Sequence, residues 1–288
     1  MHNILLQLDP DPQPSSFDAV VARDAGAETL LRHGGVAPED VRELIYGLIF
    51  TRHPDELRHS AVFIGGRDTA KAEALWQQAR KAFFGPLRVS MLLDPNGANT
   101  TAAAAIVLAG VHLPLGGSTA TVLGGTGPVG RRVARLLVRE GAHVTMVSRS
   151  AERAAHAADE LRALQPNAAV EAAEARSPHD IEPLIRGRQL VVAAGTTGVE
   201  LLPENLWRAV APKLVIDLNA VPPLGIGGID AQDAAKKYGE TLAYGAIGVG
   251  NFKMKIHRAA VKRLFTANDL LLDAEELAEI GRSLIAAG

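Results

Sequence analysis

A glycine-rich segment has the residue types and spacing to hold the phosphates of a dinucleotide. Residues 124–130 read Gly-Gly-Thr-Gly-Pro-Val-Gly and lie between the β-branched run Ala120–Leu123 and a helical pattern. In a G-x-G-x-x-G turn, Gly125 permits the sharp turn, Gly127 lets a pyrophosphate approach the backbone, and Gly130 lets helix and strand pack closely. The helix N-terminus adds amide donors and partial positive charge. We therefore predict that a dinucleotide binds at Gly125, Thr126, Gly127, Pro128, Val129 and Gly130; the alternative is a tight turn without a ligand.

The end of the next predicted strand, His143–Val147, indicates which dinucleotide binds. Proteins that prefer NAD place a carboxylate there, about 20 residues after the glycine turn, to hold the ribose hydroxyls. Here Ser148 and Arg149 follow the strand, and Arg153 lies one turn into the next helix. A guanidinium can bind a 2′-phosphate through two hydrogen bonds. We predict NADP as the cofactor, with NAD possible; in the alternative, both arginines are solvated charges at a helix start and the specificity is loose.

Two later strands end in small and polar residues that could contact the other half of such a cofactor. The predicted strand that ends at Ala193 is followed by Ala194 and Gly195, and the one that ends at Asp217 is followed two residues later by Asn219. In parallel sheets, ligands bind at the carboxyl ends of the strands. We expect the nicotinamide ribose to pass over Ala194 and Gly195, and Asn219 to hydrogen bond with the carboxamide. Ordinary turn chemistry is the alternative.

The absence of cysteine and the few tyrosines exclude several dehydrogenase mechanisms. Without cysteine there is no thiol nucleophile, thiolate-bound zinc or disulfide, and the nine histidines form no H-E-x-x-H pair. None of the three tyrosines (Tyr46, Tyr238 and Tyr244) is followed four residues later by lysine, the pair that a short-chain dehydrogenase uses as its acid. We predict no metal site. The mechanism that remains is hydride transfer from a substrate that needs no strong acid, base or nucleophile from the protein. A C–H group between two nitrogens meets this requirement, because the nitrogen lone pairs stabilise the cation left after hydride loss. The protein then mainly has to position the two rings.

The composition predicts an ordinary globular enzyme without nucleic-acid or membrane partners. Of the 288 residues, 47% are hydrophobic and 22% are charged, which argues against intrinsic disorder. The net charge of -2 provides no basic field for nucleic acid. The longest apolar run, residues 102–111, is about half the roughly 20 residues that span a bilayer. The N-terminal segment lacks the basic region of a signal peptide, so we expect a cytoplasmic protein.

Short apolar runs alternate with longer helical patterns, which predicts an α/β protein with parallel sheets covered by helices on both faces. The predicted strands are Ile4–Leu8, Ala61–Ile64, Arg88–Leu93, Ala120–Leu123, His143–Val147, Ala169–Ala172, Leu190–Ala193, Leu214–Asp217 and Leu242–Tyr244. The predicted helices are Phe17–Ala25, Pro38–Phe50, Thr69–Phe83, Asn99–Val111, Val129–Glu140, Ala151–Leu164, Pro178–Arg186, Gly248–Phe265 and Ala274–Ala286.

Pro114 and the pair Gly116-Gly117 interrupt the helical pattern and indicate a domain boundary. We expect two domains: an N-terminal α/β substrate domain over residues 1–112 and a Rossmann-type, doubly wound parallel-sheet domain over residues 113–273. The last helix, residues 274–288, could complete the first domain.

Several segments resemble a known enzyme family along essentially the whole chain. They are residues 83–90 leading to 94–101, the glycine turn 124–130, residues 222–230 and residues 252–258. In these segments the sequence resembles the bacterial NAD(P)-dependent methylene-tetrahydromethanopterin dehydrogenases. The resemblance implies reversible oxidation of methylene- to methenyl-tetrahydromethanopterin by direct hydride transfer, a step of one-carbon (formaldehyde) oxidation in methylotrophs. It also implies a pterin-binding first domain, an NADP-binding second domain and a homo-oligomer, either a trimer or a hexamer.

Two alternative functions remain at this point. The folate dehydrogenase/cyclohydrolases are similar at a greater distance, but their Tyr/Lys cyclohydrolase pair is missing here, so we predict dehydrogenase activity without cyclohydrolase activity. One alternative is therefore a methylene-tetrahydrofolate dehydrogenase, since the pterin edges of the two carriers are alike. The other is a non-catalytic dinucleotide-binding protein that only carries the fold.

Polar residues after the predicted strand Arg88–Leu93 could bind the pterin. Asp94, Asn96, Asn99 and Thr100 lie at the carboxyl end of that strand. Carboxylate and amide groups can pair with the donor–acceptor edge of a pterin ring. In the alternative, these residues form a turn and a helix N-cap. Together with the family resemblance, they predict contact with the pterin.

Two acidic and two basic residues are the remaining candidates at the substrate. Asp9 and Asp18 flank a proline-rich loop after the first strand, where a carboxylate could bind substrate amines or support the developing cation. We expect Asp9 to bind substrate and Asp18 to have a catalytic role; solvated loop acids are the alternative. Lys253 and Lys255 are about 200° apart on a helix, so at most one faces the site. The resemblance favours Lys253 as the catalytic, substrate-positioning group over Lys255 as a substrate contact, and a surface amine is the alternative.

Overall fold

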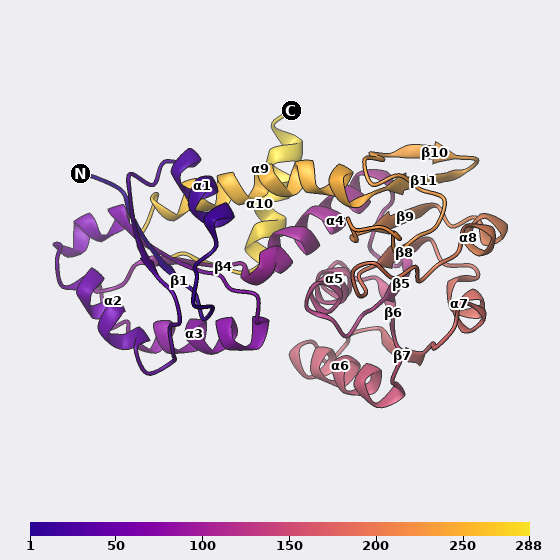
Figure 1. Cartoon of the computed structure of the whole chain (residues 1–288), viewed down its shortest axis with the longest axis horizontal. Helices are drawn as coiled ribbons and strands as arrows, with labels where there is room; N and C mark the ends of the chain where they lie inside the picture. Colours follow the sequence, from indigo (N-terminus) through magenta and orange to yellow (C-terminus); the bar gives the residue numbers. More distant parts are fainter. The chain divides into compact units, whose positions relative to one another are not determined.

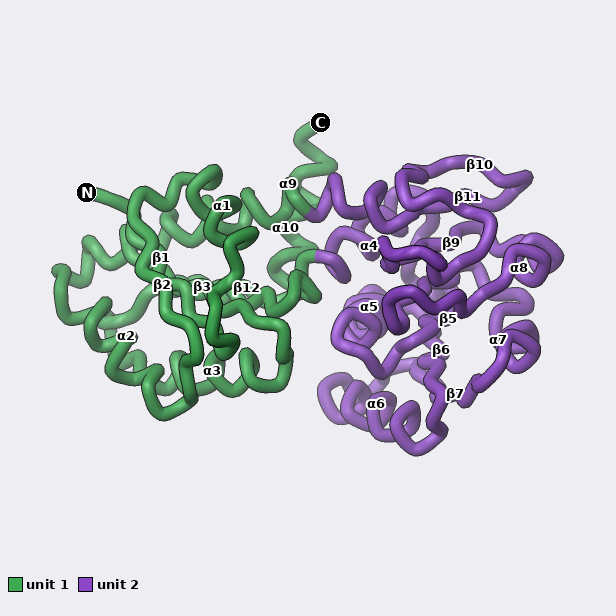
Figure 2. Tube along the Cα trace, viewed as in Figure 1, with its two compact units in different colours: residues 1–100, 254–288 green, residues 101–253 purple.

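The computed structural model describes all 288 residues and divides the chain into two compact units. Unit 1 comprises residues 1–100 and 254–288, and unit 2 comprises residues 101–253 (Figure 2). The sequence prediction places the boundary near residue 112 and assigns residues up to 273 to the second domain. The boundaries between the units differ from this prediction. The chain passes from one unit to the other twice, each time inside an uninterrupted helix: α4 (Ala98–His112) and α9 (Ala246–Leu264). The Pro/Gly segment after residue 112 is a turn within unit 2.

Unit 1 is built on a parallel five-stranded sheet with the order β12-β4-β3-β1-β2. Its strands are β1 (Ile4–Leu8), β2 (Thr29–His33), β3 (Ser60–Ile64), β4 (Ser90–Leu93) and β12 (Leu271–Leu272). Its other helical elements are α1 (Ser16–Asp24), α2 (Val41–Ile49), the 3-10 helix η1 (Pro54–His59), α3 (Thr69–Lys81), the 3-10 helix η2 (Pro95–Gly97) and α10 (Ala274–Ala286). Strands β3 and β4 are buried along their whole length, which explains their uninterrupted apolar sequences.

Helices α2 and α3 pack together on one face of this sheet and close its core. Ile45 of α2 and Leu75 of α3 are fully buried against Val62 of β3 and Met91 of β4. The core is largely aliphatic, as the low aromatic content of the chain requires. None of the helices in the protein combines the length and the apolar composition needed to cross a bilayer.

Unit 2 contains a seven-stranded sheet with the order β10-β11-β9-β8-β5-β6-β7, parallel except for β10. Its strands are β5 (Thr119–Leu123), β6 (His143–Ser148), β7 (Val170–Glu174), β8 (Leu190–Ala193), β9 (Leu214–Asp217), β10 (Lys236–Tyr238) and β11 (Thr241–Tyr244). Its helices α5 (Pro128–Arg139) and α6 (Ala151–Leu164) cover one face, and α7 (Pro178–Ile185) and α8 (Glu204–Val210) cover the other (Figure 1). This is the doubly wound α/β arrangement that the alternating pattern predicts.

Three strands, one α-helix and the two 3-10 helices have no counterpart in the sequence prediction. Strand β2 is an edge strand whose side chains are mostly exposed, so it lacks the apolar alternation that marks a half-buried strand. Strands β10 and β12 and helix α8 are only three, two and seven residues long. Elements this short show no detectable periodicity in the sequence.

Candidate functional site

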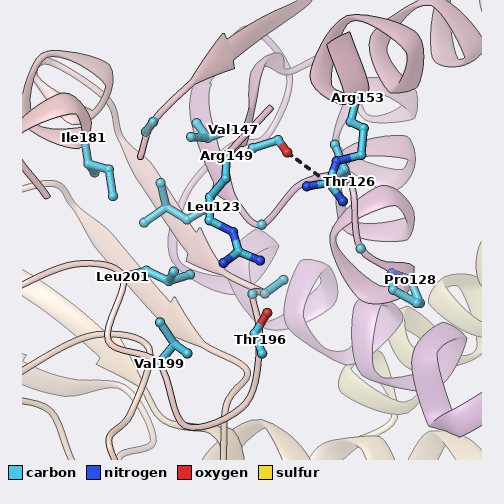
Figure 3. A pocket seen from close by; sticks show the side chains of 16 residues that line it. Leu123, Thr126, Pro128, Val147, Arg149, Arg153, Ile181, Thr196, Val199 and Leu201 are labelled. Carbon is cyan, nitrogen blue, oxygen red and sulfur yellow. Dashed lines mark hydrogen bonds between the residues drawn. The ribbon is translucent and has the colours of Figure 1, made fainter. Parts of the chain in front are cut away.

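A pocket of about 380 Å³ opens at the carboxyl ends of β5, β6 and β8 in unit 2 (Figure 3). The chain order reverses here, because β6 and β7 follow β5 on one side while β8 and β9 lie on the other. A crevice at such a reversal is the usual ligand site of a doubly wound sheet. Its lining includes eight of the predicted cofactor residues, namely Thr126, Gly127, Pro128, Ser148, Arg149, Arg153, Ala194 and Gly195.

The glycine turn is held in its shape by close packing. Gly124 has a positive φ of 74°, and a β-carbon on it would lie 2.5 Å from Gly195 Cα. The conformation that favours glycine therefore occurs at Gly124; Gly125, which the sequence prediction assigns to the sharp turn, does not have a positive φ. Gly130 has no space for a side chain, since a β-carbon there would lie 2.9 Å from Gly125 Cα. Gly130 thus packs the start of α5 against the turn, as predicted.

Gly127 differs from the other glycines of the turn because the protein itself leaves space for a side chain. The nearest atom to a β-carbon at Gly127 would be Gly124 O at 3.4 Å, an ordinary contact distance. Gly127 is the N-cap of α5, and Pro128 occupies the first helical position, where a missing N–H costs nothing. A ligand that approaches the start of α5 would explain the glycine, because packing within the chain does not.

Arg149 and Arg153 are both exposed and line the pocket. Neither guanidinium forms an ion pair or a hydrogen bond with another side chain. In Figure 3 the Arg149 side chain extends into the pocket and the Arg153 guanidinium lies beside Thr126. The hydroxyl of Ser148, which also lines the pocket, accepts a hydrogen bond from Thr126 Oγ1 at 3.3 Å. Two cations without partners at this edge are suited to a phosphate.

The remaining predicted cofactor residues do not line the pocket. Gly125, Val129 and Gly130 belong to the turn and the first turn of α5 behind it. Asn219 is buried, and its amide serves its own loop: Nδ2 donates to Pro223 O at 3.3 Å and Oδ1 accepts from Val221 N–H at 3.2 Å. These contacts correspond to the turn chemistry named above as the alternative, and the carboxamide contact stays a prediction.

An apolar wall of the pocket has no signal in the sequence. Ala175, Ile181, Val199 and Leu201 come from the segments after β7 and β8 and from α7. A β-carbon at Gly195 would lie 2.5 Å from Leu201 Cδ1, so this leucine packs directly on the loop after β8. Isolated aliphatic residues after strand ends have no recognisable spacing. Val199 is exposed, at 43%.

Three of the predicted pterin residues in unit 1 are buried and bonded to one another. Asp94 Oδ1 accepts the amides of Asn99 and Thr100, each at 3.0 Å, and its Oδ2 accepts Thr100 Oγ1–H at 2.7 Å. Asn99 Nδ2 donates to Asp273 Oδ1 at 2.6 Å. Only Asn96 is exposed, with a positive φ of 52°. The structure thus gives Asp94, Asn99 and Thr100 the capping arrangement described as the alternative, and their pterin contact stays a prediction.

The two carboxylates of the proline-rich loop converge on the end of β3. A β-carbon at Gly65 would lie 3.5 Å from Asp18 Oδ2 and 3.7 Å from Asp9 Oδ2. Asp9 is buried and accepts the amides of Asp11 and Ser15 at 2.8 and 3.2 Å. Burial raises the pKa of Asp9 above its usual range, although these two hydrogen bonds oppose the shift.

Phe17 is a residue at this edge that sequence reasoning missed. It precedes Asp18 on α1, is 54% exposed, and its ring lies 6.4 Å from that of His257. His257 in turn stacks on Phe63 with a ring separation of 5.8 Å. In a chain with only 4% aromatic residues, a phenylalanine directly before a candidate acid is the sequence signal that could have found it, and its exposure is known only from the structure.

Lys253 and Lys255 lie on α9 at positions with different exposure. Lys253 is half-buried and Lys255 is exposed, as their separation around the helix requires. Lys253 is the last residue of unit 2, whereas Lys255 belongs to unit 1. The structure describes no cluster of histidine and acidic side chains suited to a metal ion.

Comparison with known proteins identifies relatives over the full length of the chain. The bifunctional protein MdtA of Methylorubrum extorquens is 42% identical over 287 residues, which cover 98% of this chain and 98% of the relative. The NAD(P)-dependent methylenetetrahydromethanopterin dehydrogenase of the same organism is 32% identical over 93% of this chain and 94% of its own. The chain belongs to the methylene-tetrahydromethanopterin dehydrogenase family.

Two family models match separate parts of the chain. The model described as methylene-tetrahydromethanopterin dehydrogenase, N-terminal, matches residues 16–96, which include Asp18, Asp94 and Asn96. The model described as short chain dehydrogenase matches residues 118–205, the first part of the Rossmann-type sheet. The match covers the glycine turn and Arg149, and it ends before Tyr238 and Tyr244. It therefore supports the nucleotide-binding fold without supplying the Tyr/Lys acid.

Solved structures with low sequence identity share the fold of this family member. The 5-ketofructose reductase of Gluconobacter sp. strain CHM43 superposes with a TM-score of 0.52 at 14% identity over 99% of both chains. The quinate dehydrogenase from Corynebacterium glutamicum, solved in complex with NAD, has a TM-score of 0.51 at 16% identity over 98% of this chain and 100% of its own. At these identities the likeness establishes the two-unit α/β fold alone.

Proposed function

We propose that the protein catalyses the reversible oxidation of methylene-tetrahydromethanopterin to methenyl-tetrahydromethanopterin with NADP. The full-length relation to a dehydrogenase of that name carries the proposal. The pocket of unit 2 supports it independently, because it combines a glycine turn, a helix N-terminus and two arginines without partners. Methylene carriers contain the C–H between two nitrogens that suits a site without a strong acid, metal or thiol.

The residues of the pocket fit NADP by their chemistry. When bound, the nicotinamide accepts the hydride. The amides at the start of α5 and the space at Gly127 are suited to the pyrophosphate, and Arg149 and Arg153 to the 2′-phosphate. Ala194 and Gly195 leave the backbone after β8 accessible. We assign these residues to cofactor binding, and NAD is the weaker cofactor in this assignment.

The edge of unit 1 that carries Asp9, Asp18 and Phe17 is our candidate for the pterin. Asp18 is suited to favour the positive charge that develops when hydride leaves, and the exposed Phe17 ring offers a flat apolar surface to a ring system. The family model that covers Asp18 supports this placement. We retain Lys253 as the proposed substrate-positioning group, since it is half-buried where Lys255 is exposed.

Parallel assays test the function directly. Purified protein is given methylene-tetrahydromethanopterin or methylene-tetrahydrofolate, each with NADP or NAD, and reduced nicotinamide is followed by absorbance. We expect the fastest turnover with the methanopterin carrier and NADP, and no release of the formyl product that a cyclohydrolase would form. Faster turnover with the folate carrier would favour the folate alternative. Absence of turnover with both carriers, despite NADP binding, would favour the non-catalytic alternative.

We further propose that the protein is a cytoplasmic homo-oligomer, a trimer or hexamer, as the family resemblance implies. Light scattering coupled to size-exclusion chromatography gives the mass of the assembly, and a mass equal to one 30.3 kDa chain would contradict the proposal. Fractionation of cells that express the protein tests its location.

A further inference from the structure

A buried carboxylate at the end of β9 connects the loops at the carboxyl edge of the unit 2 sheet. Asp217 is 0% exposed; its Oδ1 accepts the amide N–H of Asn219 at 2.9 Å, and its Oδ2 accepts that of Ile226 at 2.9 Å. The Gly225 amide is a third main-chain donor, so the side chain acts only as an acceptor. Burial raises the pKa of Asp217, and the three amides oppose that shift. An acid in this setting organises backbone.

The loop that Asp217 holds supports a wall of the cofactor pocket. Gly225 O accepts the amides of Leu201 at 2.9 Å and Leu202 at 3.0 Å. Leu202 also forms a β-bridge with Ile226. Leu201 lines the pocket and packs on Gly195. A continuous set of bonded groups therefore leads from the Asp217 carboxylate to the pocket wall.

The same contact explains why residue 225 is glycine. A β-carbon there would lie 2.7 Å from Asp217 Oδ1 and 3.2 Å from Ala193 Cβ. Gly225 does not have a positive φ, so a left-handed backbone conformation is not the reason for glycine at this position. The close approach of the loop to the carboxylate is what excludes a side chain.

We propose that Asp217 is a positioning residue that fixes the β8 side of the cofactor pocket through Gly225 and Leu201. The proposal rests on the proposed function in one respect, because it takes the pocket to bind NADP. The glycine turn and Arg149 follow β5 and β6, whereas Leu201 and Asp217 follow β8 and β9 on the other side of the crevice. The two halves of a doubly wound sheet bind the two halves of a dinucleotide. Asp217 therefore acts on the nicotinamide half and leaves the 2′-phosphate half unaffected.

The test compares the whole cofactor with one half of it. Asp217→Asn keeps the volume but places an NH₂ donor against main-chain N–H groups. We expect the Kd for NADP to rise about tenfold, while 2′,5′-ADP, which lacks the nicotinamide, binds as in the wild type. Asp233→Asn is the matched control, because Asp233 is also buried in unit 2 but accepts from Asp230 N–H and Tyr238 Oη–H, away from the pocket. It should lower the melting temperature and change neither Kd.

Two results would overturn the proposal. One is an equal rise of the Kd for NADP and for 2′,5′-ADP in Asp217→Asn, because it would indicate a general loss of structure. The other is an unchanged Kd for NADP. A wild type that binds neither ligand would overturn it as well. If Asp217→Asn does not fold, Gly225→Ala, which displaces the same loop, is measured in its place with the same expected split.

Hydrogen exchange of the ligand-free protein provides a second measurement that does not depend on turnover. We expect the amides of Leu201 and Leu202 to exchange faster in Asp217→Asn or Gly225→Ala than in the wild type, and unchanged exchange in both variants would refute the coupling. The outcome can also separate the two proposals. If the wild type binds NADP and Asp217→Asn weakens NADP but not 2′,5′-ADP, while the wild type oxidises no methylene pterin, then the proposed function fails and the positioning role of Asp217 stands.

Discussion

At the scale of single residues, the proposed choice between NADP and NAD depends on the side chains that follow β6. An acidic residue at that position would repel a 2′-phosphate, and the chain instead has Ser148, Arg149 and Arg153. The structure places the two guanidinium groups at the pocket, with no carboxylate bound to them. Glu174, the last residue of the neighbouring strand β7, accepts a hydrogen bond from Arg176 at 2.8 Å.

Arg149→Glu should therefore reverse the cofactor preference. We expect the Kd for NADP to rise by about 10- to 100-fold, because a charge-assisted bond to phosphate is replaced by repulsion, while the Kd for NAD changes little. Isothermal titration with each dinucleotide measures both. Arg186→Glu is the matched control: it makes the same charge change on the exposed C-cap residue of α7, whose partner is Glu182, outside the pocket. Equal losses for the two dinucleotides would contradict a contact with the 2′-phosphate.

Asp9 gives a second prediction at this scale, on pH and stability. Its pKa in the folded protein is raised by burial above the ordinary value of 3.8. The folded state then binds a proton more readily than the unfolded state, so the contribution of Asp9 to the free energy of unfolding increases as the pH falls and decreases as it rises through the raised pKa. We expect the unfolding free energy of the wild type minus that of Asp9→Asn to increase when the pH is lowered from neutral. Urea titrations of both proteins at several pH values measure it, and a decrease would show that the folded protein prefers the ionised carboxylate.

At the scale of elements, the start of helix α4 shows how one sequence pattern serves two purposes. A run of Asp, Asn and Thr after a strand suits both ligand binding and helix capping. In the structure the amides at the start of the helix are satisfied by Asp94, and Asn99 connects the helix to Asp273 before α10. The capping demand of a buried helix end accounts for these residues, since each unsatisfied buried amide there would be costly.

Asp94→Ala separates the two explanations. If Asp94 only caps the helix, loss of the acceptor for two amides and one hydroxyl should lower the free energy of unfolding by about 1–3 kcal/mol and leave KM for the methylene carrier unchanged. Asp94→Asn, which keeps one acceptor oxygen for the amides, is the control and should lose less. Chemical denaturation and steady-state kinetics on the same samples provide both values. A folded Asp94→Ala protein with normal stability and a raised KM would instead support the predicted pterin contact.

At the scale of the whole molecule, the ends of the chain jointly build unit 1. Strand β12 pairs with β4, and α10 buries Leu277 and Ile280, so the last residues complete a sheet begun at the N-terminus. Each unit has its own apolar core, centred on β3 and α3 in unit 1 and on β8 and Trp207 in unit 2. One tryptophan lies in each unit, Trp76 in unit 1 and Trp207 in unit 2.

Leu277→Ala should destabilise unit 1 selectively. Leu277 is 0% exposed, and removal of a buried leucine side chain costs about 2–5 kcal/mol. In single-tryptophan variants, the unfolding transition reported by Trp76 should shift to lower denaturant, while that reported by Trp207 stays in place. Ile285→Ala, on the same helix but 43% exposed, is the control and should shift neither transition. Equal shifts of the two tryptophan signals would mean that the units unfold together.

The sequence by itself determined the features that depend on neighbouring residues. The alternation of strands and helices, the G-x-G-x-x-G turn before α5 and the arginines after β6 follow from local periodicity, glycine conformation and charge, which the chain carries wherever it folds. The tertiary structure alone decided that residues 254–288 return to unit 1, that Asp94 and Asn219 are engaged within their own loops, and that Asp217 supports the pocket wall. The return of residues 254–288 depends on partners such as β12 and β4, or Asn99 and Asp273, which are more than 170 residues apart and share no local pattern. The bonds of Asp94 and Asn219 are local, and their sequence pattern suits ligand binding and capping equally, so only the structure shows which of these contacts the chain makes. Burial and hydrogen bonding between distant segments are properties of the assembled sheet, and no window of sequence contains them.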